Sequence, residues 1–113
     1  MAIQSTNPAT GEVVRTFDAL TDAELEARLA RAAATAATYR TTTFAQRAGW
    51  LRAAADLLDA ERAEIARTMT TEMGKTVKSA RAEAAKCATG MRFYADHAPD
   101  LLADEPLEDP SGW

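Results

Sequence analysis

The feature that most limits the fold is that the helically spaced apolar residues of this chain are largely alanines. Hydrophobic residues make up 47% of the sequence, but the large ones are few. Alanine favours helix strongly and buries little surface per residue. A chain of 113 residues is also short for covering its own apolar surface. We therefore expect a mostly helical chain whose apolar faces exceed its ability to cover them.

Only the amino-terminal stretch is typical of β-strand, and it predicts a hairpin over residues 2–17. Two extended runs are joined by Asn7-Pro8-Ala9-Thr10-Gly11. Asn and Pro at the first two positions and Gly at the last suit a type I turn closed by a left-handed residue. A lone hairpin is marginal in water, so this one has to pack against another element.

Two capping boxes mark the first two helices. Thr21 with Glu24 begins a helix over about residues 22–39, and Thr43 with Gln46 begins another over about 44–59. The second helix carries a buried stripe of small and large apolar residues, namely Ala48, Leu51, Ala55 and Leu58.

Continuing that stripe would bury Arg62, which is costly without a partner. A break near residues 59–62 instead starts a helix over 62–73, with Ile65, Met69 and Met73 inward and Gly74 ending it. A last helix over 76–98 carries a predicted seam of Val77, Ala80, Ala84, Cys87, Met91, Tyr94 and Ala98. Residues 99–113, which begin at a proline, are predicted as an exit loop.

Charge and composition exclude several classes of protein. The net charge of −4 argues against a nucleic-acid binder, which needs a basic surface. One cysteine rules out an intrachain disulfide framework and fits a reducing cytoplasm. The first residues lack a secretory signal, and no apolar run approaches membrane-spanning length. We expect a cytoplasmic protein without nucleic-acid or membrane partners.

The candidate chemical motifs are weak. Gly74-Lys75-Thr76 copies the end of a phosphate-binding loop, but the required earlier glycine is Met69 and a helix precedes it, so a helical joint is favoured. Cys87 and His97 lie nearly three turns apart on one helix and cannot pair, so Cys87 is interpreted as a small core residue. His97 has no second ligand at metal spacing. No metal site is expected.

Four local sequences, taken in order, resemble the aldehyde dehydrogenase family. They are Ser5-Thr6-Asn7-Pro8-Ala9-Thr10-Gly11-Glu12-Val13, Phe44-Ala45-Gln46-Arg47-Ala48 with Ala55-Asp56-Leu57-Leu58, Thr71-Glu72-Met73-Gly74-Lys75-Thr76, and Lys86-Cys87-Ala88 leading into Met91-Arg92-Phe93-Tyr94-Ala95-Asp96-His97-Ala98. The third is close to the Glu-Met-Gly-Lys signature of the succinate-semialdehyde branch. Each is weak alone, but together they span nearly the whole chain, about the first quarter of a family member.

The resemblance implies an amino-terminal segment, residues 1–113, of the cofactor-binding domain of an α/β enzyme with a Rossmann-like fold, a catalytic domain and an oligomerisation arm. Family members attack the aldehyde with a cysteine thiolate, hold the oxyanion with an asparagine and a backbone N–H, and pass hydride to NAD or NADP. Those residues, and the glutamate that activates water, are expected beyond Trp113, so this chain alone is expected to be inactive and to bind no cofactor.

By the same likeness, Glu83, Lys86, Cys87 and Gly90 are expected near the mouth of the substrate tunnel, where a lysine would steer an anionic semialdehyde. The last residues, Asp109-Pro110-Ser111-Gly112-Trp113, depart from the branch and suggest a truncation, a frame disruption or a deliberately short chain. The expected partners are the remainder of the dehydrogenase chain and further copies in a homo-oligomer. The alternative is a free-standing helical interaction module that has reused this segment.

Overall fold

A computed structural model describes residues 3–106, which form a β-hairpin followed by four helices. The strands β1 (Ile3–Thr6) and β2 (Val13–Phe17) pair antiparallel, with a register shift after Ser5. Gly11 adopts a positive φ of 75°, and its N–H donates to the Asn7 carbonyl at 2.8 Å. The predicted hairpin and its left-handed closing residue are confirmed; residue 2 lies outside the described residues.

The helices are α1 (Asp22–Tyr39), α2 (Phe44–Ala60), α3 (Arg62–Met73) and α4 (Val77–Leu101). Both predicted capping boxes form, with each threonine side chain accepting from the backbone N–H three residues on. The predicted break falls at Glu61, whose φ of −95° and ψ of 9° separate α2 from α3. Local capping chemistry therefore sets most of these boundaries.

Helix α4 runs further than the sequence predicted. The exit loop was expected from residue 99, but the helix continues through Pro99 to Leu101. Proline removes one backbone donor and so one helical hydrogen bond. The Leu102 N–H nevertheless donates to the Ala98 carbonyl at 3.0 Å, and the last turn stays helical. The rest of the predicted loop from residue 107 onward lies outside the described residues.

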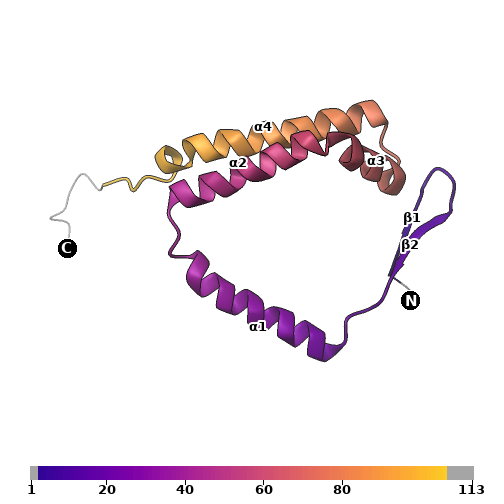
Figure 1. Cartoon of the computed structure of the whole chain (residues 1–113), viewed down its shortest axis with the longest axis horizontal. Helices are drawn as coiled ribbons and strands as arrows, with labels where there is room; N and C mark the ends of the chain where they lie inside the picture. The colour runs from indigo at the N-terminus through magenta and orange to yellow at the C-terminus, as the bar shows by residue number, and fades with distance from the viewer. Residues whose placement is uncertain (1–2, 107–113) are drawn as a thin grey trace.

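The core is built from alanines. The buried apolar residues are Ala48, Ala55, Ala66, Ala80, Ala84, Ala88 and Ala95, and among the described residues no large side chain is fully buried. Their short side chains let α2 and α3 lie against α4, and Figure 1 shows α2 and α4 side by side. The predicted α2 stripe is confirmed, since Ala48 and Ala55 are buried and Leu51 and Leu58 are half-buried.

Two details of the predicted inward faces are wrong. Met73, expected inward, is 71% exposed. The α4 seam passes through Ala88 and Ala95 instead of Cys87 and Tyr94, which are exposed, and Val77, predicted to begin the seam, is 52% exposed. The prediction assumed a repeat of 3.5 residues, whereas a straight α-helix repeats every 3.6 and its buried face drifts by about 20° per heptad. On a helical wheel Cys87 and Tyr94 therefore fall about 20° and 40° to one side of Ala80, whereas the buried Ala84, Ala88 and Ala95 fall about 40–80° to its other side.

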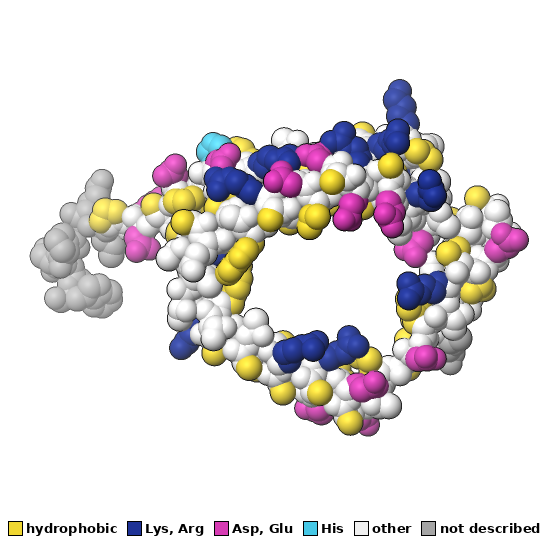
Figure 2. Space-filling model, in the orientation of Figure 1, with side chains coloured by type: hydrophobic (Ala, Val, Ile, Leu, Met, Phe, Trp, Pro, Cys, Tyr) yellow, Lys and Arg dark blue, Asp and Glu magenta, His cyan; other side chains and the backbone are white. Residues whose placement is uncertain are grey.

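The molecule is far more open than a compact domain of its length. Its radius of gyration is 20.5 Å, against about 13 Å expected for a compact chain of this size. Helix α1 has no buried residue and lies apart from α2, α3 and α4 (Figure 1). Figure 2 shows an opening that persists in the space-filling surface between α1 and the α2–α3 side. The expected surplus of apolar surface is confirmed.

Candidate functional site

The joint between α3 and α4 carries the Gly74-Lys75-Thr76 sequence. Gly74 is left-handed at φ 70° and caps α3, and the Thr76 hydroxyl accepts from the Ser79 N–H at 3.3 Å to cap α4. The Lys75 ammonium pairs with the Glu83 carboxylate on α4. Gly74 and Thr76 thus cap the two helices, and Lys75 pairs with α4. The prediction that this sequence is a joint between helices, and not a phosphate-binding loop, is confirmed.

The hairpin is fastened to this joint. The Ser5 hydroxyl on β1 donates to a Glu72 carboxylate oxygen on α3 at 3.0 Å. The ring of Pro8, in the hairpin turn, lies against Gly74, so that a Cβ added there would lie only 3.1 Å from the proline Cγ. The predicted need of the hairpin for a packing partner is met at the end of α3.

A cavity of about 470 Å³ opens beside the first half of α4, lined by Ser79, Ala82, Glu83, Lys86 and Cys87. The structure thus brings together three of the four predicted site residues. Gly90 is half-buried one turn further along and is not among the lining residues. Glu83 is held by Lys75, whereas Lys86 forms no ion pair within residues 3–106.

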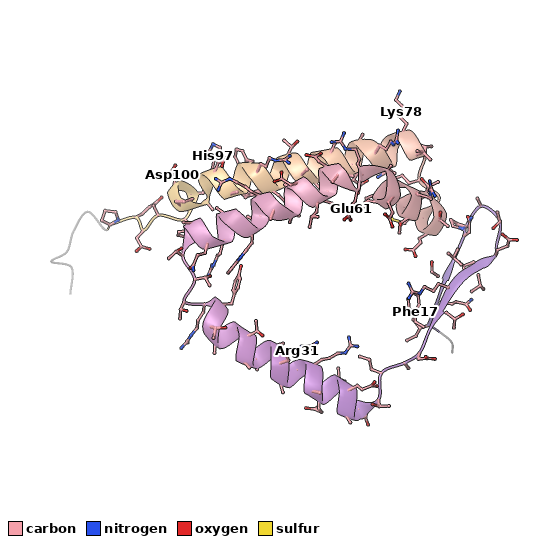
Figure 3. The ribbon with its side chains drawn as sticks, viewed as in Figure 1. Phe17, Arg31, Glu61, Lys78, His97 and Asp100 are labelled. Atoms are coloured by element: carbon pink, nitrogen blue, oxygen red, sulfur yellow. The ribbon has the colours of Figure 1, made fainter. Side chains whose placement is uncertain are left out.

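Cys87 is exposed and not part of the core, which corrects the interpretation from sequence. The adjacent Ala88 takes the buried position on α4. His97 is exposed on the far part of the helix (Figure 3). Its Nδ1 lies 2.8 Å from the Phe93 carbonyl oxygen, and its ring stacks on that of Phe93. Ten residues of helix separate the two by about 15 Å along the axis, so they form no nucleophile–base pair.

Arginine–aspartate pairs join α2 to α4. Arg92 of α4 reaches Asp56 at 2.7 Å and Asp59 at 2.8 Å, and Arg52 of α2 reaches Asp96 at 2.6 Å. Arg62, which the sequence flagged as needing a partner, pairs with Asp59. We call these residues the arginine–aspartate ladder. The earlier residue of α2, Arg52, pairs with the later residue of α4, whereas Asp56 and Asp59 pair with the earlier one, so the two helices run antiparallel.

The ladder shifts the titration of two of its members. Hydrogen bonds from Arg62, and then from Arg92, hold the pKa of Asp59 below its ordinary value. Hydrogen bonds to Asp56, and then to Asp59, raise the pKa of Arg92. These groups are solvated, so the ladder orients the two helices and contributes only modestly to stability. It is not an acid–base pair for catalysis.

A second cavity, of about 310 Å³, lies where the α1–α2 connection meets the end of α4, and sequence reasoning missed it. The Tyr39 and Trp50 rings stack there with centroids 5.8 Å apart, and the Arg47 guanidinium lies 4.7 Å from the Tyr39 centroid. Trp50 is 52% exposed. The only signal in the sequence was that two aromatic residues, Tyr39 and Phe44, flank the break at Thr41-Thr42-Thr43.

Within residues 3–106 no cluster of side chains has metal-binding composition, and no helix there has the length and apolarity to cross a membrane. The described residues therefore offer an open cavity with a lysine and a thiol, an aromatic cavity and an ion-pair ladder. They show no complete set of nucleophile, base and oxyanion donors.

Comparison with known proteins identifies the family of this chain. The family model for the aldehyde dehydrogenase family matches residues 1–111. The chain is 59% identical to a succinate-semialdehyde dehydrogenase [NADP(+)] of Mycobacterium avium over 109 residues, covering 96% of this chain and 23% of that protein. It is 57% identical to such an enzyme, numbered 1, of Mycobacterium tuberculosis, covering 96% of this chain and 24% of that protein.

The fold leads to the same relatives. The structure superposes with a TM-score of 0.88 on a succinic semialdehyde dehydrogenase of Streptococcus pyogenes in complex with NADP+, at 36% identity, covering 96% of this chain and 24% of that one. The chain thus spans about a quarter of the length of the relatives it matches. With a family model over nearly its whole length, the chain belongs to the aldehyde dehydrogenase family.

Proposed function

We propose that this chain is the amino-terminal part of the cofactor-binding domain of an NADP-dependent succinate-semialdehyde dehydrogenase of the cytoplasm. The observation that carries the proposal is the 59% identity over 96% of the chain with a relative that bears this activity. The open architecture, with its alanine core and exposed α1, supports the role of a part that needs the remainder of the enzyme to cover it.

In the complete enzyme the reaction would be oxidation of succinate semialdehyde to the acid, with hydride passed to NADP. The family's cysteine nucleophile, oxyanion-binding asparagine and water-activating glutamate would come from the remainder of the chain. This segment would contribute scaffold: the α2–α4 pair, the hairpin seated on α3 and the surfaces that join them to other parts. By itself it would neither bind NADP nor turn over aldehyde. The complete enzyme would be a homo-oligomer.

The cavity on α4 is the candidate for contact with the substrate route. Glu83, Lys86 and Cys87 line it, and Gly90 follows on the same helix. Because Lys75 already neutralises Glu83, the Lys86 ammonium is the positive charge that remains for an anion. Succinate semialdehyde carries a carboxylate at the end opposite its aldehyde, so a cation at a tunnel mouth would favour its entry. Cys87 would line this route and would not act as the nucleophile.

The test is a chimera in which this chain replaces the matching residues of the Mycobacterium avium enzyme. We expect NADP reduction with succinate semialdehyde at a rate within about tenfold of the parent, because a scaffold segment changes the barrier by less than about 1.4 kcal/mol. A matched chimera carrying the corresponding segment of the Mycobacterium tuberculosis relative controls for the grafting. Loss of activity only with this chain, in soluble protein, would overturn the proposal.

A further inference from the structure

The cavity beside the first half of α4 is lined by two residues of opposite charge, Glu83 and Lys86. They are three positions apart on one helix, a spacing at which a glutamate and the following lysine can pair. The structure instead pairs Glu83 with the Lys75 ammonium, which comes from the joint between α3 and α4 and is not among the lining residues. Lys86 forms no ion pair within residues 3–106. The partner of the Glu83 carboxylate therefore determines whether the charge of Lys86 is balanced.

Lys75 is held in place by the residues on either side of it. Gly74 ends α3 in the left-handed conformation, and Thr76 caps the first turn of α4. The Lys75 and Glu83 side chains are only 32% and 42% exposed. Salt screens a partly buried pair less than an exposed one, so this pair retains its attraction at physiological ionic strength. The Glu83 charge is thus balanced from the joint and not by Lys86.

We propose that Lys75 is a specificity-determining residue that keeps this cavity positive for an anionic aldehyde. While Lys75 balances Glu83, the cavity carries the charge of Lys86, because no further acidic or basic side chain of residues 3–106 lines it. Without Lys75, the Glu83 carboxylate would be free to balance Lys86 one helical turn away. Lys75 acts through Glu83 and does not touch the substrate, so it is a positioning residue. The inference rests on the proposed function, which assigns this cavity to the substrate route.

The test is Lys75→Met in the active chimera, assayed with succinate semialdehyde and with an uncharged aldehyde of similar length. KM for succinate semialdehyde is expected to rise about twofold to fivefold with kcat nearly unchanged, because the lost attraction is common to the ground and transition states. KM for the uncharged aldehyde is expected to stay the same. Lys75→Arg keeps a cation at this position and is expected to retain the parent KM. An equal rise for both aldehydes would overturn the proposal, since it would indicate a general distortion of α4.

The Glu83→Gln background separates charge from folding. In that background Lys75→Met is expected to leave KM for succinate semialdehyde unchanged, because no carboxylate is released. Glu83→Gln alone is expected to leave that KM unchanged or to lower it. A rise would overturn the proposal even if Lys75→Met failed to fold.

Lys78→Met is the matched control, because it removes the same charge from a side chain that points away from the molecule (Figure 3). It is expected to leave KM for both aldehydes unchanged, and a rise as large as that of Lys75→Met would overturn the proposal. An inactive unsubstituted chimera would instead overturn the proposed function. An active chimera without these differences in KM would overturn only the role of Lys75, so the two failures are distinguishable.

Discussion

A side chain on Gly74 would crowd the ring of Pro8, since a Cβ built there lies 3.1 Å from the proline Cγ. The two residues are far apart in sequence, one in the hairpin turn and the other at the end of α3. Together with the hydrogen bond from Ser5 to Glu72, this contact fixes the hairpin on the helices. Gly74 therefore serves both as a left-handed helix cap and as a seat for the hairpin.

Gly74→Ala is expected to destabilise the chimera by about 1–2 kcal/mol from the positive φ alone, with a further loss from the contact with Pro8. A double-mutant cycle with Pro8→Ala separates the two, because removing the ring relieves the contact and leaves the backbone cost. Thermal inactivation of the four proteins is the measurement. Strict additivity would show that the contact with Pro8 contributes nothing.

Breaking the arginine–aspartate ladder is expected to have a small effect that salt removes. Arg92→Met loses the bonds to Asp56 and Asp59, and each exposed pair is worth about 0.2–1 kcal/mol. Arg52→Met, which loses only the bond to Asp96, is the matched variant and should cost less. Thermal midpoints at ~0.05 M and ~1 M salt provide the comparison. A cost of Arg92→Met that is unchanged at high salt would contradict an electrostatic origin.

The pH dependence of stability follows from Asp59. Its pKa is lowered in the folded state, by the hydrogen bond from Arg62 first and by that from Arg92 second. A lowered pKa gives stability that is complete above the unfolded value of about 3.9 and is lost as pH falls through the folded value. The stability difference between the chimera and its Asp59→Asn variant should thus be constant from about pH 5 to 7 and shrink below about pH 4. A difference that shrinks already between pH 7 and 5 would assign the effect to another group.

Most of the fold was predictable because it is set locally. The Thr21 and Thr43 caps, the Asn7–Gly11 turn and the Gly74 terminator each act within a few residues, and the structure has them all. Which of Cys87 and Ala88 is buried on α4 could not be predicted from the local sequence. Both are small, and only the placement of α2 and α3 decides which one they cover. The cavity at Tyr39 and Trp50 likewise depends on tertiary placement.

Lys86 should affect the affinity for an anionic aldehyde more than the chemical step. Lys86→Gln in the chimera is expected to raise KM for succinate semialdehyde about threefold to tenfold, with kcat nearly unchanged, because it removes attraction common to ground and transition states. An uncharged aldehyde of similar length should show no change. Lys78→Gln is the control, since Lys78 on the same helix points away from the molecule (Figure 3). A parallel rise in KM for both aldehydes would contradict electrostatic steering.

We propose that these residues form a scaffold that requires the rest of a dehydrogenase. The alternative is a self-sufficient helical module. Differential scanning calorimetry of the isolated 113-residue chain separates them most directly. The alanine core and the uncovered α1 predict no cooperative heat-absorption peak. A single sharp transition with an enthalpy near the roughly 80 kcal/mol expected for a globular domain of this length would contradict the account.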